Sequence, residues 1–270
     1  MLRTAAPGRL GPTQECPETR PHTVKISGNT IFIPGATSGI GLGLALRLHA
    51  AGNKVIIAGR REEQLRRITA EHPGVESVVI DTTDPSSVKK AAETVQTRFP
   101  ETNVLITMAG IMRPEDFHTG DFLGTAEATV DTNLLGPLRL IAAFTEFLAA
   151  KPEATLMTVS SGLAFVPLPL TPTYSATKAA IHSLTSALRV QLADTGVQVI
   201  ELVPPAVRTA LMGQENAENA MPLEDYLSEV MTLLETRPDA DEILVENVKL
   251  LRFAEANGSY DEVLGLLSSH

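Results

Sequence analysis

The 270-residue chain has one cysteine and no tryptophan, and its acidic residues outnumber its basic ones. The single cysteine, Cys16, excludes an internal disulfide and most structural zinc sites. Its six histidines lack the spacing of metal ligands, so we expect no metal centre. A formal net charge of −10 argues against a nucleic-acid or anionic-membrane partner. No apolar run reaches the roughly 18 residues that cross a bilayer. With a single cysteine, a reducing, cytoplasmic setting is expected.

What the chain does contain is the composition of a folded domain. Hydrophobic residues make up 43% and charged residues 20%, which favours a packed core over disorder. Residues 1–24 differ from the rest, because they are rich in proline and have little apolar periodicity. We expect them to form a disordered N-terminal tail. Residues 25–270 are predicted to form one domain, since a fold of this size can remain a single unit.

Short apolar, β-branched runs alternate with helical patterns from residue 30 onward. The predicted strands are 30–34, 54–58, 76–80, 104–108, 155–160 and 197–203, and the main predicted helices are 42–51, 62–71, 85–98, 125–149 and 174–194. Continuously apolar strands are typical of parallel strands that helices cover on both faces. The pattern predicts an α/β fold with a doubly wound, Rossmann-like, mostly parallel sheet. Such sheets bind ligands beyond the carboxyl ends of their strands.

A glycine-rich turn follows the first predicted strand and opens the first predicted helix. Its sequence is Gly35-Ala36-Thr37-Ser38-Gly39-Ile40-Gly41. Glycines let the backbone approach a pyrophosphate closely, and the helix N-terminus supplies free N–H groups and positive potential. In this position between strand and helix, the turn predicts a dinucleotide site that involves Gly35, Thr37, Ser38, Gly39, Ile40 and Gly41.

The end of the second predicted strand indicates which dinucleotide binds. An NAD site would place Asp or Glu there for the ribose 2′-hydroxyl, but the chain has Arg60 and Arg61. A guanidinium suits the extra 2′-phosphate of NADP, so Arg60 favours NADP(H), and NAD(H) is the weaker alternative. Two solvated arginines on a surface helix would be the structural explanation. Cations in a first helical turn oppose the helix dipole, however, which favours an anionic partner.

Tyr174 and Lys178 are four residues apart on a predicted helix, so their side chains share one face. A free tyrosine has a pKa near 10, and a neighbouring ammonium would lower this pKa. Ser161 closes the fifth predicted strand and faces the same cleft. A carbonyl oxygen could accept hydrogen bonds from the tyrosine and the serine as negative charge develops on it. The pattern predicts proton transfer by Tyr174.

These residues together resemble the short-chain dehydrogenase/reductase family, in its compact single-domain branch. The resemblance rests on the spacing of the three glycines and on the serine, tyrosine and lysine. It implies that Ser161, rather than Ser160, polarises the carbonyl and that Asn133 holds a water against Lys178. The catalytic residues are thus expected to be Asn133, Ser161, Tyr174 and Lys178.

The same resemblance implies the other cofactor contacts and also reveals departures. It assigns the adenine to Asp81 and Thr82, the adenosine ribose to the small Ala109 and Gly110, the nicotinamide ribose to Tyr174 and Lys178, and the carboxamide to Val207 and Thr209. Pro34, Met108 and Pro205 replace the residues usual in the family, and its seventh strand is not recognisable near the C-terminus. Residues 243–256 and 260–267 are predicted to be helical instead. These departures resemble a bacterial offshoot named for D-alanine esterification of teichoic acids.

The sequence therefore predicts an NADP(H)-dependent oxidoreductase that interconverts a carbonyl and an alcohol on an apolar small molecule. Residues 210–235 are expected to include a substrate flap, and small-residue helix faces predict a homodimer or homotetramer. Two alternatives are a catalytically silent NADP(H)-sensing or regulatory protein and a reductase of an imine or activated C=C. The three departures favour the silent protein, whereas the intact Ser161, Tyr174 and Lys178 favour an enzyme.

Overall fold

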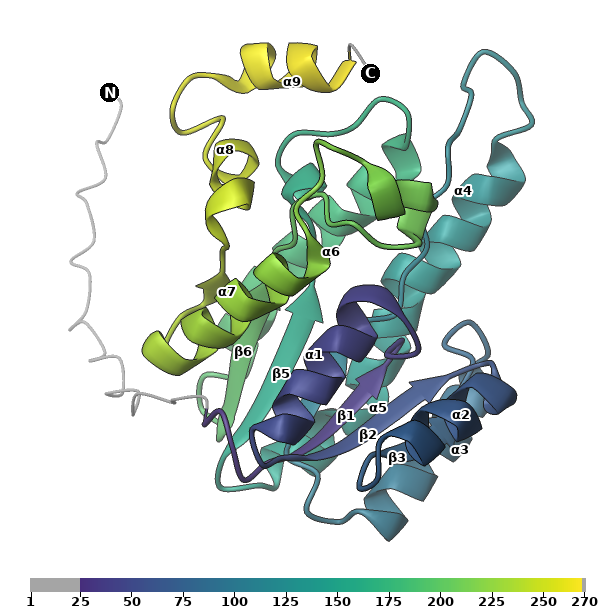
Figure 1. Ribbon diagram of the computed structural model, residues 1–270, viewed down its shortest axis with the longest axis vertical. Coiled ribbons are helices and arrows are strands. Elements are labelled where there is room, and N and C mark those ends of the chain that lie inside the picture. Colours follow the sequence, from purple (N-terminus) through teal and green to yellow (C-terminus); the bar gives the residue numbers. More distant parts are fainter. Residues whose placement is uncertain (1–24, 269–270) are drawn as a thin grey trace, which may run out of the picture.

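The centre of the molecule is a seven-stranded, fully parallel sheet (Figure 1). The computed structural model describes residues 25–268, apart from the side chain of Glu215, so the predicted disordered tail over residues 1–24 lies outside the described residues. The strands are β1 (Thr30–Pro34), β2 (Lys54–Gly59), β3 (Glu76–Val79), β4 (Val104–Thr107), β5 (Ala154–Val159), β6 (Val197–Leu202) and β7 (Glu242–Ile243). Their order is β3-β2-β1-β4-β5-β6-β7, which confirms the predicted doubly wound sheet.

Helices cover both faces of the sheet and form two separate apolar cores. One core packs the sheet against α1 (Gly39–Ala50), α2 (Glu62–Glu71) and α7 (Leu223–Thr236). The other packs it against α3 (Pro85–Arg98), α5 (Gly136–Ala149) and α6 (Pro172–Gln191). Since both faces are covered, the strands are mainly apolar rather than alternating. In the part of the chain that the structure describes, no helix is both long and apolar enough to cross a membrane.

Helix starts follow the local sequence. The Asp84 carboxylate accepts a hydrogen bond from the backbone N–H of Ser86 at 2.9 Å, and Pro85 occupies the first position of α3. Pro172 likewise opens α6, where its missing N–H costs nothing. These starts place the long α6 helix so that its N-terminal half reaches the carboxyl ends of the strands.

The structure differs from the predicted elements in two places. The predicted helix over 125–149 is α4 (Leu123–Val130), a π-helical turn (Asp131–Leu135) and α5 in succession. The seventh strand, which the sequence did not reveal, is the two-residue β7, and it pairs with β6 at Glu201 and Leu202. The prediction of a helix from residue 243 was therefore wrong at its start. A strand of two residues is too short to produce a hydrophobic period.

The C-terminal segment returns to the end of the sheet where the strands finish. After the short 3₁₀ turn Glu246–Val248 come α8 (Lys249–Arg252) and α9 (Tyr260–Ser268), drawn in yellow beyond the carboxyl end of β5 (Figure 1). Val263 of α9 packs with Val166 and Ala254 in a third small apolar cluster. The helical tail thus lies at the predicted ligand-binding edge of the sheet.

One core residue leads to a stability prediction. Tyr226 of α7 is fully buried, and its hydroxyl has no hydrogen-bond partner within the described residues 25–268. On folding this hydroxyl loses its hydrogen bonds to water without gaining others, which destabilises the folded protein. Tyr226→Phe removes the hydroxyl and is therefore expected to stabilise the protein by about 1 kcal/mol. Thermal unfolding should show a midpoint about 2–4 °C higher. A lower midpoint would contradict this expectation.

Candidate active site

A cavity of about 740 Å³ opens beyond the carboxyl ends of the strands. It lies where the strand order reverses between β1 and β4, the position at which doubly wound sheets bind ligands. Every predicted site residue except Asn133 lines it. These are Gly35, Thr37, Ser38, Gly39, Ile40, Gly41, Arg60, Asp81, Thr82, Ala109, Gly110, Ser161, Tyr174, Lys178, Val207 and Thr209.

The glycine-rich turn has a shape that side chains would prevent. Gly35 has a φ of +94°, and a Cβ there would lie 2.5 Å from the backbone N and Cα of Ala109. Gly39 has a φ of +54°, and a Cβ at Gly41 would lie 2.7 Å from the carbonyl oxygen of Gly35. The turn is therefore pressed against the segment after β4. This close packing brings the start of α1 to the cavity.

The N-terminus of α1 has the electrostatic character of an anion site. Its cap residue Ser38 makes no side-chain capping bond to the described chain, and the first turn of the helix contains no acid. The free N–H groups and the helix dipole therefore present positive potential to the cavity.

Two arginines stand on the same side of the cavity. Arg61 donates from Nη2 to Thr37 Oγ1 at 3.2 Å, and both Arg60 and Arg61 line the wall. The Asp81 carboxylate accepts from the backbone N–H and hydroxyl of Thr83, at 3.0 and 2.7 Å. Although burial opposes it, these hydrogen bonds and the Arg60 charge lower the pKa of Asp81. The aspartate thus carries a negative charge beside Arg60 at neutral pH.

Tyr174, Lys178 and Ser161 all line the same cavity. The Lys178 ammonium lies 5.5 Å from the centre of the Tyr174 ring and donates to the Val159 carbonyl at 2.8 Å. Burial raises the pKa of Tyr174 to about 12, against a lowering by its hydrogen bond to Ser161. Burial also lowers the pKa of Lys178 to about 8, and the negative charge of Glu201 opposes this shift.

The expected lowering of the Tyr174 pKa by the ammonium is not found. The reason is that Tyr174 is almost fully buried, with 8% of the residue exposed, so desolvation disfavours the phenolate and outweighs the lowering by the hydrogen bond to Ser161. A tyrosine with a high pKa is protonated at neutral pH. It is therefore suited to giving up a proton to a developing oxyanion.

Asn133 lies in the π-helical turn and not in the cavity wall. Its side chain donates to the Ile111 carbonyl at 2.7 Å and accepts from the Ile111 N–H at 2.8 Å. A Cβ on Gly110 would lie 3.4 Å from Asn133 Oδ1 and 4.0 Å from Lys178 Nζ. Asn133 thus holds the segment after β4, and only a glycine separates it from the lysine.

The buried ammonium makes stability depend on pH. Below pH 8 the Lys178 amine is protonated in the folded and in the unfolded protein, so the burial of its charge destabilises the folded protein. Between about 8 and its unfolded value of 10.5 only the unfolded chain keeps the proton, and stability rises with pH. The shift corresponds to about 3 kcal/mol. Lys178→Met removes this cost but also loses the hydrogen bond to the Val159 carbonyl. The net effect at pH 7 should be a stabilisation of about 1–2 kcal/mol.

Urea unfolding of Lys178→Met and of the wild type at pH 7 and pH 10 measures this effect. The difference between the two proteins should shrink at the higher pH. A variant that is less stable at pH 7 would show that the ammonium is fully compensated in the folded state.

The sequence did not reveal several residues of the cavity. Thr83 adjoins the predicted Asp81 and Thr82, so its neighbours could have indicated it. Leu251 of α8 and Leu267 of α9 also line the cavity, and a Cβ on Gly162 would lie 2.6 Å from Leu251 Cδ1. No local signal could have placed these two leucines there, because the tertiary fold alone brings the tail back to the sheet.

Solved structures with this arrangement include two that hold a nicotinamide nucleotide. A short chain dehydrogenase from Burkholderia cenocepacia, crystallised in complex with NADP, superimposes with a TM-score of 0.76 at 26% identity, over 90% of this chain and 99% of that one. A 3-ketoacyl-(acyl-carrier-protein) reductase from Brucella melitensis, complexed with NADH, has a TM-score of 0.72 at 24% identity, over 80% and 94% of the two chains. At 24% identity, the similarity to the Brucella reductase shows a shared fold alone.

Sequence comparison identifies the family. An uncharacterised oxidoreductase of Bacillus subtilis named DltE is 38% identical over 244 residues, which cover 89% of this chain and 96% of that protein. This relative agrees with the predicted resemblance to the offshoot named for teichoic-acid esterification. The family profile described as short chain dehydrogenase matches residues 29–220. The chain is therefore a member of the short-chain dehydrogenase/reductase family of oxidoreductases.

Proposed function

We propose that this protein is an NADP(H)-dependent oxidoreductase that interconverts a carbonyl and an alcohol on an apolar small molecule. The observation that carries the proposal is the convergence of Ser161, Tyr174 and Lys178 on one cavity, which the glycine-rich turn also lines. A catalytically silent protein has no need of a buried proton donor. The family membership and the NADP complex of the Burkholderia relative support the same function.

The residues present fit a nicotinamide dinucleotide. The turn at Gly35 leaves no room for a side chain, and α1 points uncapped N–H groups at the cavity within the described chain. A pyrophosphate suits this position. Arg60 and Arg61 supply the positive charge that a ribose 2′-phosphate would need. They stand at the end of β2, where an NAD site would have an Asp or Glu for the ribose 2′-hydroxyl. We therefore assign NADP(H) in preference to NAD(H).

Asp81 and Thr82 would hold the adenine and Val207 and Thr209 the carboxamide, since all four line the cavity. When bound, the reduced nicotinamide supplies the hydride for the carbonyl carbon. Tyr174 then gives its proton to the carbonyl oxygen, and Ser161 donates a hydrogen bond to the same oxygen. Lys178, with a pKa of about 8, would bind the nicotinamide ribose and return a proton to the tyrosine. Asn133 positions the segment beside the lysine.

An apolar wall favours an uncharged substrate. It comprises Ile111, Met112, Leu163, Leu168, Leu170, Leu211, Met212, Leu251 and Leu267. The 3₁₀ segment Leu211–Asn216 contains a kink at Met212, which has a φ of 59°. This segment belongs to the predicted flap over residues 210–235, within which α7 begins at Leu223. The flap and the homodimer or homotetramer stay predictions.

Cofactor choice can be tested at the arginines. Arg60→Ala should weaken NADPH binding about 10- to 100-fold, because a charge-assisted hydrogen bond contributes roughly 1.5–3 kcal/mol. NADH binding should change less than about twofold, which makes NADH the internal control. Fluorescence titration with each nucleotide measures both values. Equal losses for the two nucleotides would remove the assignment of Arg60 to the 2′-phosphate.

The reaction class can be tested with a substrate panel. We expect NADPH oxidation with apolar ketones or aldehydes and little with charged ones. Oxidation only with imines or activated alkenes would favour the alternative reductase. Tight NADPH binding without turnover of any compound would favour the silent regulatory protein.

A further inference from the structure

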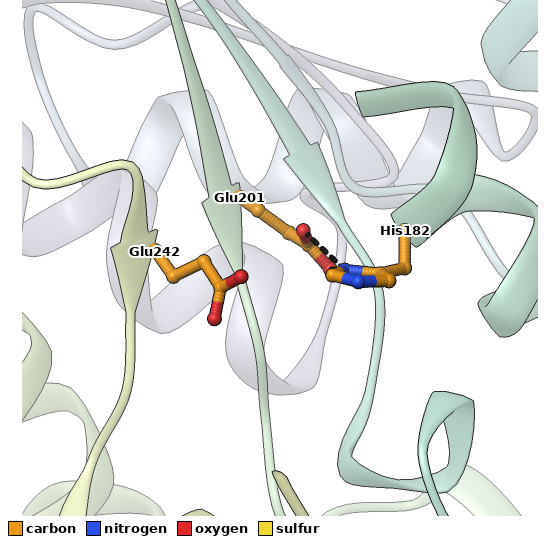
Figure 2. A group of neighbouring side chains, drawn as sticks. All are labelled: His182, Glu201 and Glu242. Carbon is orange, nitrogen blue, oxygen red and sulfur yellow. Dashed lines mark hydrogen bonds and ion pairs between the residues drawn. The ribbon is translucent and has the colours of Figure 1, made fainter. Parts of the chain in front are cut away.

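A polar cluster lies behind the active site, outside the cavity. His182, Glu201 and Glu242 come from α6, β6 and β7, and Figure 2 shows their side chains gathered between these elements. Glu201 is 0% exposed although it carries a carboxylate. His182 Nδ1 lies 2.9 and 3.1 Å from the two Glu201 oxygens. A fully buried carboxylate in a strand is costly unless charges or hydrogen bonds compensate it.

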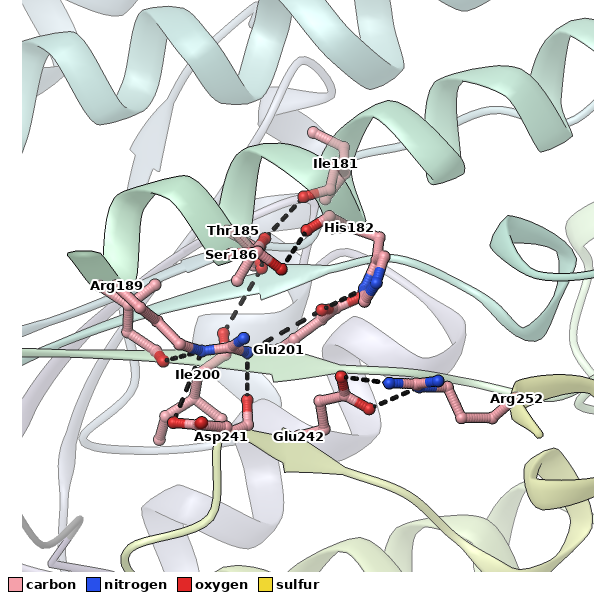
Figure 3. Close-up of polar contacts among 12 residues, drawn as sticks. Ile181, His182, Thr185, Ser186, Arg189, Ile200, Glu201, Asp241, Glu242 and Arg252 are labelled. Atoms are coloured by element: carbon pink, nitrogen blue, oxygen red, sulfur yellow. Dashed lines mark hydrogen bonds and ion pairs between the residues drawn. The ribbon is translucent and has the colours of Figure 1, made fainter. Parts of the chain in front are cut away.

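The cluster does not have the character of a metal site. One ligand atom from each residue lies within 4.8 Å of the others, as a small cation would need. Arg252, however, donates to both Glu242 oxygens at 2.7 and 2.9 Å, and Arg189 Nη2 lies 3.9 Å from Glu201 (Figure 3). A cation would have to displace these guanidinium groups. The carboxylates therefore serve charges of the protein itself.

One such charge belongs to the active site. Tyr174, Lys178 and His182 are spaced four residues apart along α6 and so share one face of the helix. Lys178 Nζ donates to the Val159 carbonyl, and Glu201 is paired with the preceding strand residue, Thr158. Glu201 is thus one register position away from the strand residue to which the lysine is anchored.

The charge of Glu201 reaches the lysine through the protein interior. Six per cent of Lys178 is exposed, so little solvent screens the attraction between the ammonium and this carboxylate. Accordingly Glu201 raises the pKa of Lys178, against the effect of burial. The other charged groups that face Glu201 act in both directions. They are Arg189 on α6, which also pairs with Asp241, Glu242 on β7, and Arg252 on α8.

We propose that Glu201, held in place by His182, is a positioning residue of the active site whose buried carboxylate keeps Lys178 in its ammonium form at neutral pH. The proposal rests on the proposed function in one respect only, namely that the reaction uses the ammonium of Lys178. His182 fixes the carboxylate from the next turn of the same helix. Arg189 competes with Lys178 for the same negative charge.

The direct test is a titration of Lys178 by NMR without cofactor or substrate. The chain has seven lysines, so lysine labelled with ¹³C at Cε yields few signals, and Lys178→Arg identifies the one of interest. Glu201→Gln keeps the shape of the side chain and removes its charge. The midpoint for Lys178 should fall by about one unit. At pH 7.5 this shift lowers the ammonium fraction about threefold.

Glu242→Gln is the matched control, because it makes the same chemical change in the same cluster, and the Lys178 midpoint should stay within about 0.3 units. Arg189→Met gives the opposite sign: without its competing charge the midpoint should rise, which keeps the test decisive if Glu201→Gln does not fold. An unchanged midpoint in Glu201→Gln, an equal fall in Glu242→Gln, or a constant or lower midpoint in Arg189→Met would overturn the proposal.

The pH profile of NADPH-dependent reduction provides a second readout. In Glu201→Gln its alkaline limb should move to lower pH by the shift found in the titration. A merely structural loss would lower the rate by the same factor at every pH, and that result would overturn the proposal. Absence of turnover in the wild type would contradict the proposed function, and the titration would still decide the role of Glu201.

Discussion

Tyr174→Phe is expected to lower turnover about 10²- to 10⁴-fold while NADPH binds as in the wild type. The change removes one hydroxyl from a side chain of which 8% is exposed and leaves its packing in place. The hydroxyl is the proposed proton donor, and its pKa of about 12 keeps it protonated up to alkaline pH. Ser161 could still donate a hydrogen bond to the carbonyl oxygen but could not replace the proton transfer. Initial rates with the best ketone or aldehyde of the panel measure the effect.

The chain provides a control of its own for this variant. Tyr260 lies at the start of α9, outside the cavity lining, so Tyr260→Phe should retain the wild-type rate. Nucleotide binding by Tyr174→Phe, followed by fluorescence, separates a catalytic loss from a binding loss. If Tyr174→Phe keeps more than a tenth of the turnover, the tyrosine is not the proton donor.

Gly35→Ala is expected to destabilise the protein by several kcal/mol and to weaken NADPH binding by at least about tenfold. A φ of +94° strains any residue with a Cβ, at a cost of about 1–3 kcal/mol. The added methyl would also lie 2.5 Å from backbone atoms of Ala109, which cannot move as a side chain could. Overpacking of this kind adds about 1–3 kcal/mol and moves the turn, and with it the start of α1, away from the segment after β4. Urea unfolding and nucleotide titration measure the two effects.

Gly28→Ala separates the two causes. Gly28 has a φ of +79°, similar to that of Gly35, but a Cβ there would meet no described atom within 4 Å. It should therefore show the backbone strain alone and leave NADPH binding unchanged. Equal losses of stability in both variants would mean that the contact with Ala109 is unimportant.

The departures from the family pattern are compatible with the structure. Pro34 ends β1 opposite Ala58, and the neighbouring Gly35 N–H donates to the Ala58 carbonyl at 2.8 Å. Met108 packs against the apolar core, and Pro205 lines the cavity. None of the three moves the serine, the tyrosine or the lysine out of the cavity. They therefore give little support to a catalytically silent protein.

The sequence by itself determined the alternation of the first six strands with helices, the parallel sheet, and the glycine-rich turn and catalytic residues that line the cavity. These features follow from local patterns, because apolar period, glycine turns and helix caps act over a few residues. It also indicated the shared helix face of Tyr174 and Lys178, since four residues make about one turn.

The tertiary structure alone decided the protonation of the site and the closure of the cavity. Burial raises the pKa of Tyr174, contrary to the lowering expected from its spacing to Lys178, and burial also lowers the pKa of Lys178. Glu201 reaches the lysine, and Leu267 reaches the cavity, from distant parts of the chain. Desolvation and long-range charge depend on which segments the fold brings together, and no local pattern in the sequence carries that information.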